Sequence, residues 1–241
     1  MKKLKITLGG LALGALMALV PFTSQGTIIG SKHDFSIATN YWVGGTNNWT
    51  VGFGSTNVCG ECHTIHHAPD PARGPLWIHT PTANTFKTYD QSGSETFPSG
   101  LTVTLGSSSK ACLSCHDGSI AINSQDSGAT PGTTTTVKGG TGVFIAPSAI
   151  VVEVAGGQDD LTHMHPIGVN YASAISYLPT AALNPITTPI GGGSISTVML
   201  KNGNVECSSC HDIHRTQGTS STSGIYTVAS GQALCLTCHN K

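Results

Sequence analysis

The amino-acid sequence predicts a chain that is mostly coil, with short helices at four copies of one motif, few short strands and no classical layered core. Three observations lead to this prediction. Only 10% of the 241 residues are charged and 6% are aromatic, whereas 30 are glycine. The pattern Cys-x-x-Cys-His occurs four times, and its copies are irregularly spaced. A polypeptide of this composition builds a poor hydrophobic core by itself.

The four copies of the motif use all 8 cysteines of the chain. In chain order they are Cys59, Cys62 and His63; Cys112, Cys115 and His116; Cys207, Cys210 and His211; and Cys235, Cys238 and His239. On a helical turn, positions i, i+3 and i+4 share one face, so two thiols and an imidazole point at one ligand. This is the attachment pattern of haem c, whose iron takes the histidine. We therefore expect four haem c groups.

Paired cysteines at this spacing also occur in zinc sites, in thioredoxin-like redox pairs and in disulfide scaffolds. None of these alternatives requires a histidine directly after the second cysteine. Histidine makes up 11 of the 241 residues. Its occurrence after all four pairs therefore has a chance probability on the order of 10^-5. The histidines favour haem, which would also supply the missing apolar bulk.

Residues 1–26 have the pattern of a signal peptide, followed by a single tetrahaem domain at 27–241. Three lysines precede an apolar run at 6–22, and small residues before Thr27 fit cleavage. The alternative is an uncleaved anchor, but about 17 apolar residues are at the short edge of the spanning range. We expect an exported protein, extracellular or at the cell surface, with the periplasm as the alternative and no membrane span after cleavage. Haem would template the folding of this domain.

The composition of the expected mature chain also limits its partners. Loss of the three N-terminal lysines leaves 8 basic and 12 acidic residues, a formal net charge of −4. The sequence has no basic stripe of the kind that binds nucleic acid, so no nucleic-acid partner is expected.

Histidines outside the motifs indicate the class of function. There are seven: His33, His66, His67, His79, His163, His165 and His214. Methionine is the other common axial donor, but the expected mature chain has only Met164 and Met199. We therefore expect four haems with two histidine ligands each. Such low-spin irons have no open position, which favours electron transfer over an enzyme, and their potentials are lower than those of His/Met haems.

His66 and His214 each follow a motif histidine by three residues. Residues at i and i+3 lie on one side of a helix, about 5–6 Å apart, so they cannot bind opposite faces of one iron. Each is expected to ligate a haem other than its own, or none. His165 lies before a proline in a rigid turn and is a further ligand candidate, while His33 and His79 compete for the remaining place.

The chain resembles multihaem c-type cytochromes with doubled CxxCH motifs. Within them it is most similar to the extracellular tetrahaem filament cytochromes, or nanowires, of the OmcE-like family. The similar segments are CHTIH (62–66), PLW (75–77), ACLSCHDG (111–118), HPIG (165–168), SCHDIH (209–214) and ALCLTCH (233–239).

The resemblance implies electron transfer through a head-to-tail homopolymer, with other cytochromes or extracellular acceptors as partners. It implies that His66 ligates a haem of the neighbouring subunit. It also favours His33, His165 and His214 as distal ligands within the subunit, with His79 as an alternative to His33. A head-to-tail interface that does not close makes a helical fibre. The rival interpretations are a soluble tetrahaem shuttle and a multihaem reductase, which would need an open haem.

Overall fold

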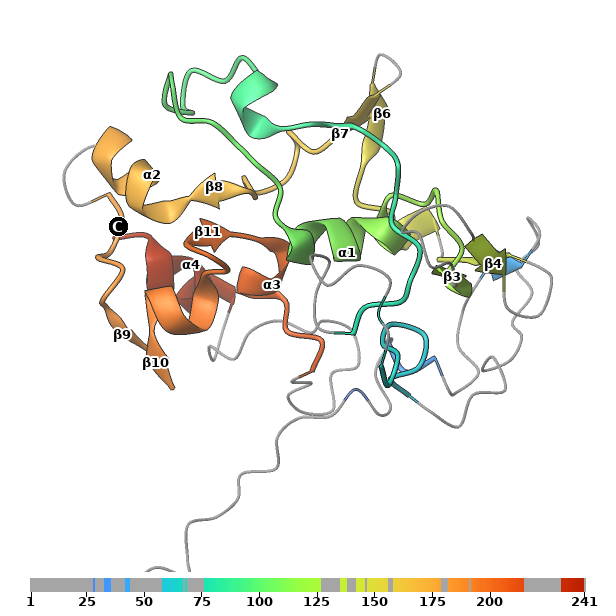
Figure 1. The fold of residues 1–241 in the computed structure, drawn as a ribbon. Coiled ribbons are helices and arrows are strands. Elements are labelled where there is room, and N and C mark those ends of the chain that lie inside the picture. The colour runs from blue at the N-terminus through green and yellow to red at the C-terminus, as the bar shows by residue number, and fades with distance from the viewer. Residues whose placement is uncertain are drawn as a thin grey trace, which may run out of the picture.

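The computed structural model of the chain has short elements joined by long stretches of coil (Figure 1). It describes residues 28, 33–35, 42–43, 58–66, 68, 76–126, 135–137, 142–145, 147–155, 158–178, 182–190, 192–214 and 231–240. Within these residues there is no layered core and no closed sheet, and the predicted fold class is confirmed. The predicted signal peptide at 1–26 lies outside the described residues. No helix in the described part of the chain has both the length and the apolar character needed to cross a bilayer.

Three of the four motifs lie on short helices, as predicted. Helix α1 (Ser107–His116) carries the second motif, α3 (Cys207–Cys210) begins the third, and α4 (Gly231–Cys238) carries most of the fourth. The first motif forms a single turn, in which the His63 N–H donates to the Cys59 carbonyl over 2.9 Å. The remaining helical elements are η2 (Tyr89–Gln91), η3 (Pro147–Ala149), α2 (Tyr171–Tyr177) and the π-helical turn η4 (Ile195–Met199).

The strands are two or three residues long and form small separate sheets. The antiparallel pairs are β1 (Trp42–Val43) with β5 (Val143–Phe144), β3 (Ser124–Asp126) with β4 (Thr135–Val137), β8 (Val169–Asn170) with β11 (Asn204–Val205), and β9 (Pro189–Ile190) with β10 (Gly193–Ser194). The largest described sheet has the order β2 (Phe86–Lys87), β7 (Gln158–Asp160), β6 (Glu153–Ala155). Strand β2 is parallel to β7, and β6 is antiparallel to it.

The sequence also predicts short strands at 101–105 and 149–154, and the structure differs at both. Residues 101–105 form only a single bridge, between Val103 and Val169, beside a 2.9 Å hydrogen bond from the Thr104 N–H to the Gly168 carbonyl. The pairing stops there because Gly168 has a φ of +77° and turns the chain, after which Val169 pairs with β11. Of residues 149–154, the first closes the turn η3 and only the last two are in β6.

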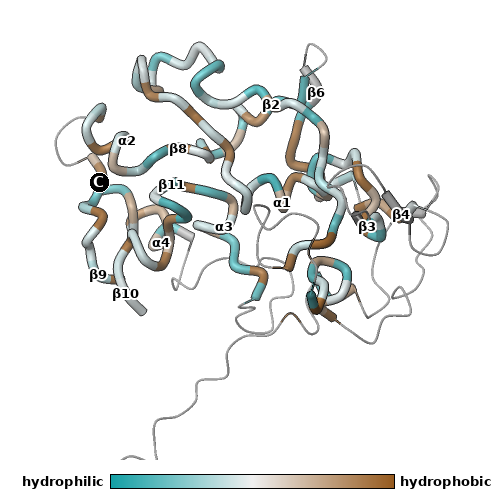
Figure 2. Tube along the Cα trace, in the orientation of Figure 1, coloured by the Kyte–Doolittle hydropathy of each residue, from teal (hydrophilic) through white to brown (hydrophobic). Residues whose placement is uncertain are grey.

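The apolar side chains gather in four small clusters instead of one core. Their buried members in the described residues are Tyr171, Ile195, Met199 and Leu200; Phe35, Ile122 and Val143; Leu101, Val169 and Ala174; and Leu113, Leu161 and Ile167. Figure 2 shows the reason, because hydrophobic stretches along the chain are short and alternate with hydrophilic ones. Clusters this small bury little apolar area, so they supply only part of the stability of a domain of this size.

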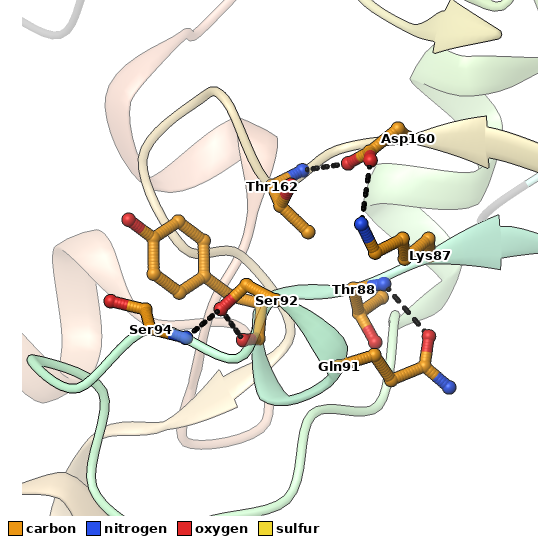
Figure 3. A network of polar contacts seen from close by, with 8 residues as sticks. Lys87, Thr88, Gln91, Ser92, Ser94, Asp160 and Thr162 are labelled. Carbon is orange, nitrogen blue, oxygen red and sulfur yellow. Dashed lines mark hydrogen bonds and ion pairs between the residues drawn. The ribbon is translucent and has the colours of Figure 1, made fainter. Parts of the chain in front are cut away.

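A polar network fixes the junction between β2 and β7 (Figure 3). The Lys87 ammonium lies 2.9 Å from Asp160 Oδ2, and the Thr162 backbone N–H donates to Asp160 Oδ1 over 2.7 Å. Hydrogen bonds from Thr162, and then from Lys87, lower the pKa of Asp160 to about 2. The ionised carboxylate therefore stabilises this edge of the fold.

We predict that the contribution of Asp160 to stability depends on pH. Its pKa in the folded protein is below the ordinary value of 3.8, so the stabilisation is present above about pH 4 and lost as the pH falls toward about 2. The difference in melting temperature between wild type and Asp160→Asn should therefore narrow from pH 6 to pH 2.5. Glu95→Gln, at an exposed carboxylate, is the control. A difference that stays constant with pH would contradict this assignment.

We also predict that Gly168 is needed both for its conformation and for space. An added Cβ would lie 2.8 Å from the backbone carbonyl of Thr104, in a residue that already has a positive φ. Gly168→Ala should destabilise the haem-loaded protein by about 3 kcal/mol. Gly93→Ala is the matched control, because Gly93 has a φ of +69° and open space around it, and should cost about 1 kcal/mol. Thermal unfolding measures the stability of both variants. Equal losses of stability would show that the close approach of Thr104 to Gly168 is unimportant.

Candidate haem-binding sites

None of the described motif cysteines forms a disulfide, and their thiols differ in environment. Burial raises the pKa of Cys62 to about 12, and burial also raises the pKa of Cys115. A thioredoxin-like cysteine needs the opposite, a lowered pKa that makes its thiolate a nucleophile at neutral pH. At the first two motifs the buried thiols therefore fit covalent attachment to an apolar ligand better than disulfide exchange.

The first motif is held by pairing with the segment that contains Trp77. The Thr64 N–H donates to the Leu76 carbonyl over 2.8 Å, and the Ile78 N–H donates to the Cys62 carbonyl over 2.9 Å. The Trp77 indole lies edge-on to the His63 ring, with 5.7 Å between ring centroids. This pairing holds the first motif in place, whereas helix α1 holds the second.

Three motif histidines face a second histidine within the described residues. The pairs are His33 with His116, His63 with His214, and His165 with His239, each with ring centroids 6.1 Å apart. An imidazole nitrogen binds a metal at about 2 Å, so two imidazoles on opposite sides of one metal have centroids roughly 6 Å apart. The observed spacing therefore fits two axial ligands of a haem iron, with the thiols of the motif beside one of them.

Hydrogen bonds to backbone carbonyls set the orientation of two of these rings. Nδ1 of His116 lies 2.8 Å from the carbonyl oxygen of Ala149, and Nδ1 of His165 lies 3.0 Å from that of Pro166. Only a protonated nitrogen can donate to a carbonyl, so in the neutral tautomer that fits this contact Nδ1 carries the proton and Nε2 has the lone pair. This is the usual arrangement of a metal-binding histidine, in which the second nitrogen anchors the ring.

His33 is also in the neutral form that binds iron. Its pKa is lowered to about 4, first by burial and then by the nearby rings of His116, His211 and His214. Its ring makes edge contact with Phe35, which belongs to a buried apolar cluster. The short described segment 33–35 thus brings His33 to the second motif.

His79 has a different environment from the paired histidines. It is 2% exposed, and its two ring nitrogens lie 2.8 Å from the Thr80 carbonyl oxygen and 3.0 Å from that of Ala121. Its Nε2 is also 3.4 Å from Cys115 Sγ. Burial is the main cause of its lowered pKa. Each nitrogen therefore lies within hydrogen-bond distance of a backbone carbonyl oxygen, next to the second motif, and in the neutral ring one of the two donates.

The other predicted site residues lie nearer the surface. His66 and His211 are both exposed, and Ile65, next to His66, is 84% exposed. His163 is exposed as well, and His67 lies outside the described residues.

Two buried carboxylates at the motifs were missed by the sequence analysis. Glu61 lies inside the first motif and Glu206 directly precedes the third, and each is 1% exposed. The available signal was their position, since a charged residue beside a motif cysteine is notable in a chain with 10% charged residues. Their burial could not be foreseen, because it depends on partners far away in the sequence.

Comparison with known protein families supports the assignment of the motifs. The family model of the doubled CXXCH motif matches residues 200–241, which contain the third and fourth motifs. No curated protein matches the chain. The doubled motif is a feature of multihaem c-type cytochromes. The CXXCH motifs indicate covalently bound haem c, and they support electron transfer as the function of this protein.

Proposed function

We propose that the protein is a tetrahaem c-type cytochrome in which every haem iron has two histidine ligands, and that it passes electrons from haem to haem. The observation that carries this proposal is the set of three histidine pairs with ring centroids 6.1 Å apart. Haem with two histidines is low-spin and has no position for a substrate, so its chemistry is the gain and loss of one electron.

The pairs support a proposed distal ligand for three of the haems. His214 serves the haem of the first motif, His33 that of the second and His165 that of the fourth. His79 is left with a structural role, because its ring is buried between two backbone carbonyl oxygens and its N–H donates to one of them. His214 belongs to the segment of the third motif, so its bond to the first haem would hold the first and third haems near one another and shorten the path of an electron between them.

We further propose that copies of the chain join head to tail into an extracellular filament. His66 cannot bind the far face of the haem on His63, because three residues span at most about 11 Å and cannot pass around the edge of a haem. It is exposed beside Ile65, which is 84% exposed, and can reach another molecule. The exposed His211 would bind the iron of the third haem from one side. His66 of a neighbouring copy would bind the same iron from the other side. The resemblance to filament cytochromes supports the same arrangement.

We predict that removal of each paired distal histidine leaves one haem iron with a free coordination position. His33→Ala, His165→Ala and His214→Ala should each convert one low-spin haem to high-spin, because alanine cannot bind iron. Absorption and electron paramagnetic resonance spectra of the oxidised proteins measure the change. The matched controls are His79→Ala and His163→Ala, which should keep the wild-type spectrum.

A high-spin signal in His79→Ala together with a normal spectrum in His33→Ala would reverse the assignment of these two residues. The reduced wild-type protein should not bind carbon monoxide, because both axial positions are filled. Binding would favour the rival interpretation, a multihaem reductase.

We predict that the haem-loaded protein forms filaments that depend on His66. Negative-stain electron microscopy of wild type should show filaments, and His66→Ala should give separate particles with a normal haem content. His163→Ala, at another exposed histidine, should still polymerise. Filaments in His66→Ala would reassign the bridging residue. Separate particles in the wild type would favour a soluble tetrahaem shuttle.

A further inference from the structure

Glu206 lies where the helices of the second and third motifs meet. Its Oε1 accepts a 2.9 Å hydrogen bond from the Gly106 N–H at the start of α1, and its Oε2 accepts one from the Ser109 hydroxyl. Glu206 also precedes α3, where its own N–H donates to Ser209 Oγ over 2.9 Å. One side chain therefore ties the first turn of α1 to the beginning of α3.

Serine side chains complete this junction. Ser109, which is 0% exposed, accepts a 3.0 Å hydrogen bond from the Cys207 N–H while it donates to Glu206. The hydroxyls of Ser108 and Ser208 lie 2.7 Å apart. At the same junction, the interaction between the Cys112 and Cys207 thiols raises the pKa of Cys112 and lowers that of Cys207. The attachment cysteines of two motifs are thus held against one another by a buried polar clamp.

The space around the carboxylate is fully used. A Cβ added at Gly106 would lie 2.6 Å from Glu206 Oε1, so a larger residue there would push the carboxylate out of place. Glycine at position 106 is thereby explained by the approach of Glu206 alone, since its φ is that of ordinary extended backbone.

The Glu206 carboxylate is also unusual because it is buried without a cationic side chain beside it among the described residues. Both carboxylate oxygens act as acceptors, and the side chain is 1% exposed. Among the described residues no lysine, arginine or histidine forms an ion pair with it. A buried carboxylate is costly without compensating positive charge. It interacts electrostatically with Cys207, an attachment site. A ferric haem at that site carries one more positive charge than a ferrous haem and would provide the compensation.

We propose that Glu206 is a positioning residue that fixes the second and third haem sites relative to one another and, through its buried negative charge, lowers the reduction potentials of both haems. The inference rests on the proposed function, because it requires haem at the second motif as well as the third. A negative charge in a region of low dielectric stabilises the ferric state over the ferrous state, so it opposes reduction.

The test is a potentiometric titration of the full haem-loaded chain carrying Glu206→Gln. Glutamine has nearly the same shape and still accepts a hydrogen bond from Gly106, but it has no charge. We expect full haem content and a shift of two haem components to more positive potential. Glu95→Gln, at an exposed site, is the matched control and should leave every component in place. Unchanged potentials in Glu206→Gln would overturn the proposal.

A second variant keeps the proposal testable if Glu206→Gln does not assemble. Gly106→Ala retains the charge but displaces the carboxylate, and it should lower the melting temperature and shift the same two components. Wild-type melting and wild-type potentials in Gly106→Ala would overturn the proposal.

Intact-mass measurement of the wild type counts the haems first. Fewer than four would contradict the proposed function, whereas four haems with unchanged potentials in the variants would contradict only the role of Glu206.

Discussion

Pairs of imidazole rings, spaced as two ligands of one metal atom would be, bring together distant parts of this chain. The three pairs join His33 to His116, His63 to His214 and His165 to His239, and the members of each pair lie far apart in the sequence. Contacts between two rings supply little free energy by themselves, and ordering the long loops between them is costly. Bonds to a shared iron would repay that cost, so folding and haem attachment are coupled.

Three of the four small apolar clusters follow from the same constraint. Each of the three packs against a motif cysteine, namely Cys62, Cys207 or Cys238, whereas the cluster around Leu101 has no motif residue among its described members. Buried polar groups, including Glu61, Glu206 and His79, occupy positions that a conventional core would give to aliphatic side chains. The protein therefore specifies its arrangement largely by hydrogen bonds, and its apolar mass has to come from the cofactor.

The sequence predicted the fold class and the helices at the motifs, because the Cys-x-x-Cys-His pattern defines its own local geometry. It did not predict which distal histidine faces which motif, since such pairs depend on the path of the whole chain. The strand expected at 101–105 was wrong because the turn at Gly168 limits it to one bridge. The Glu206 clamp was missed because its partner Ser109 is 97 residues away.

The connection between His63 and His214 has a consequence for biogenesis. A chain emerges from its N-terminus, so early segments can begin to fold before later ones exist. Under the proposed ligation, His33 precedes His116, so both histidines of the second motif's haem would be present as soon as that motif has emerged. The haem of the first motif would wait for its second histidine until the chain has reached His214, within the segment of the third motif. Its iron would therefore stay accessible during most of chain synthesis.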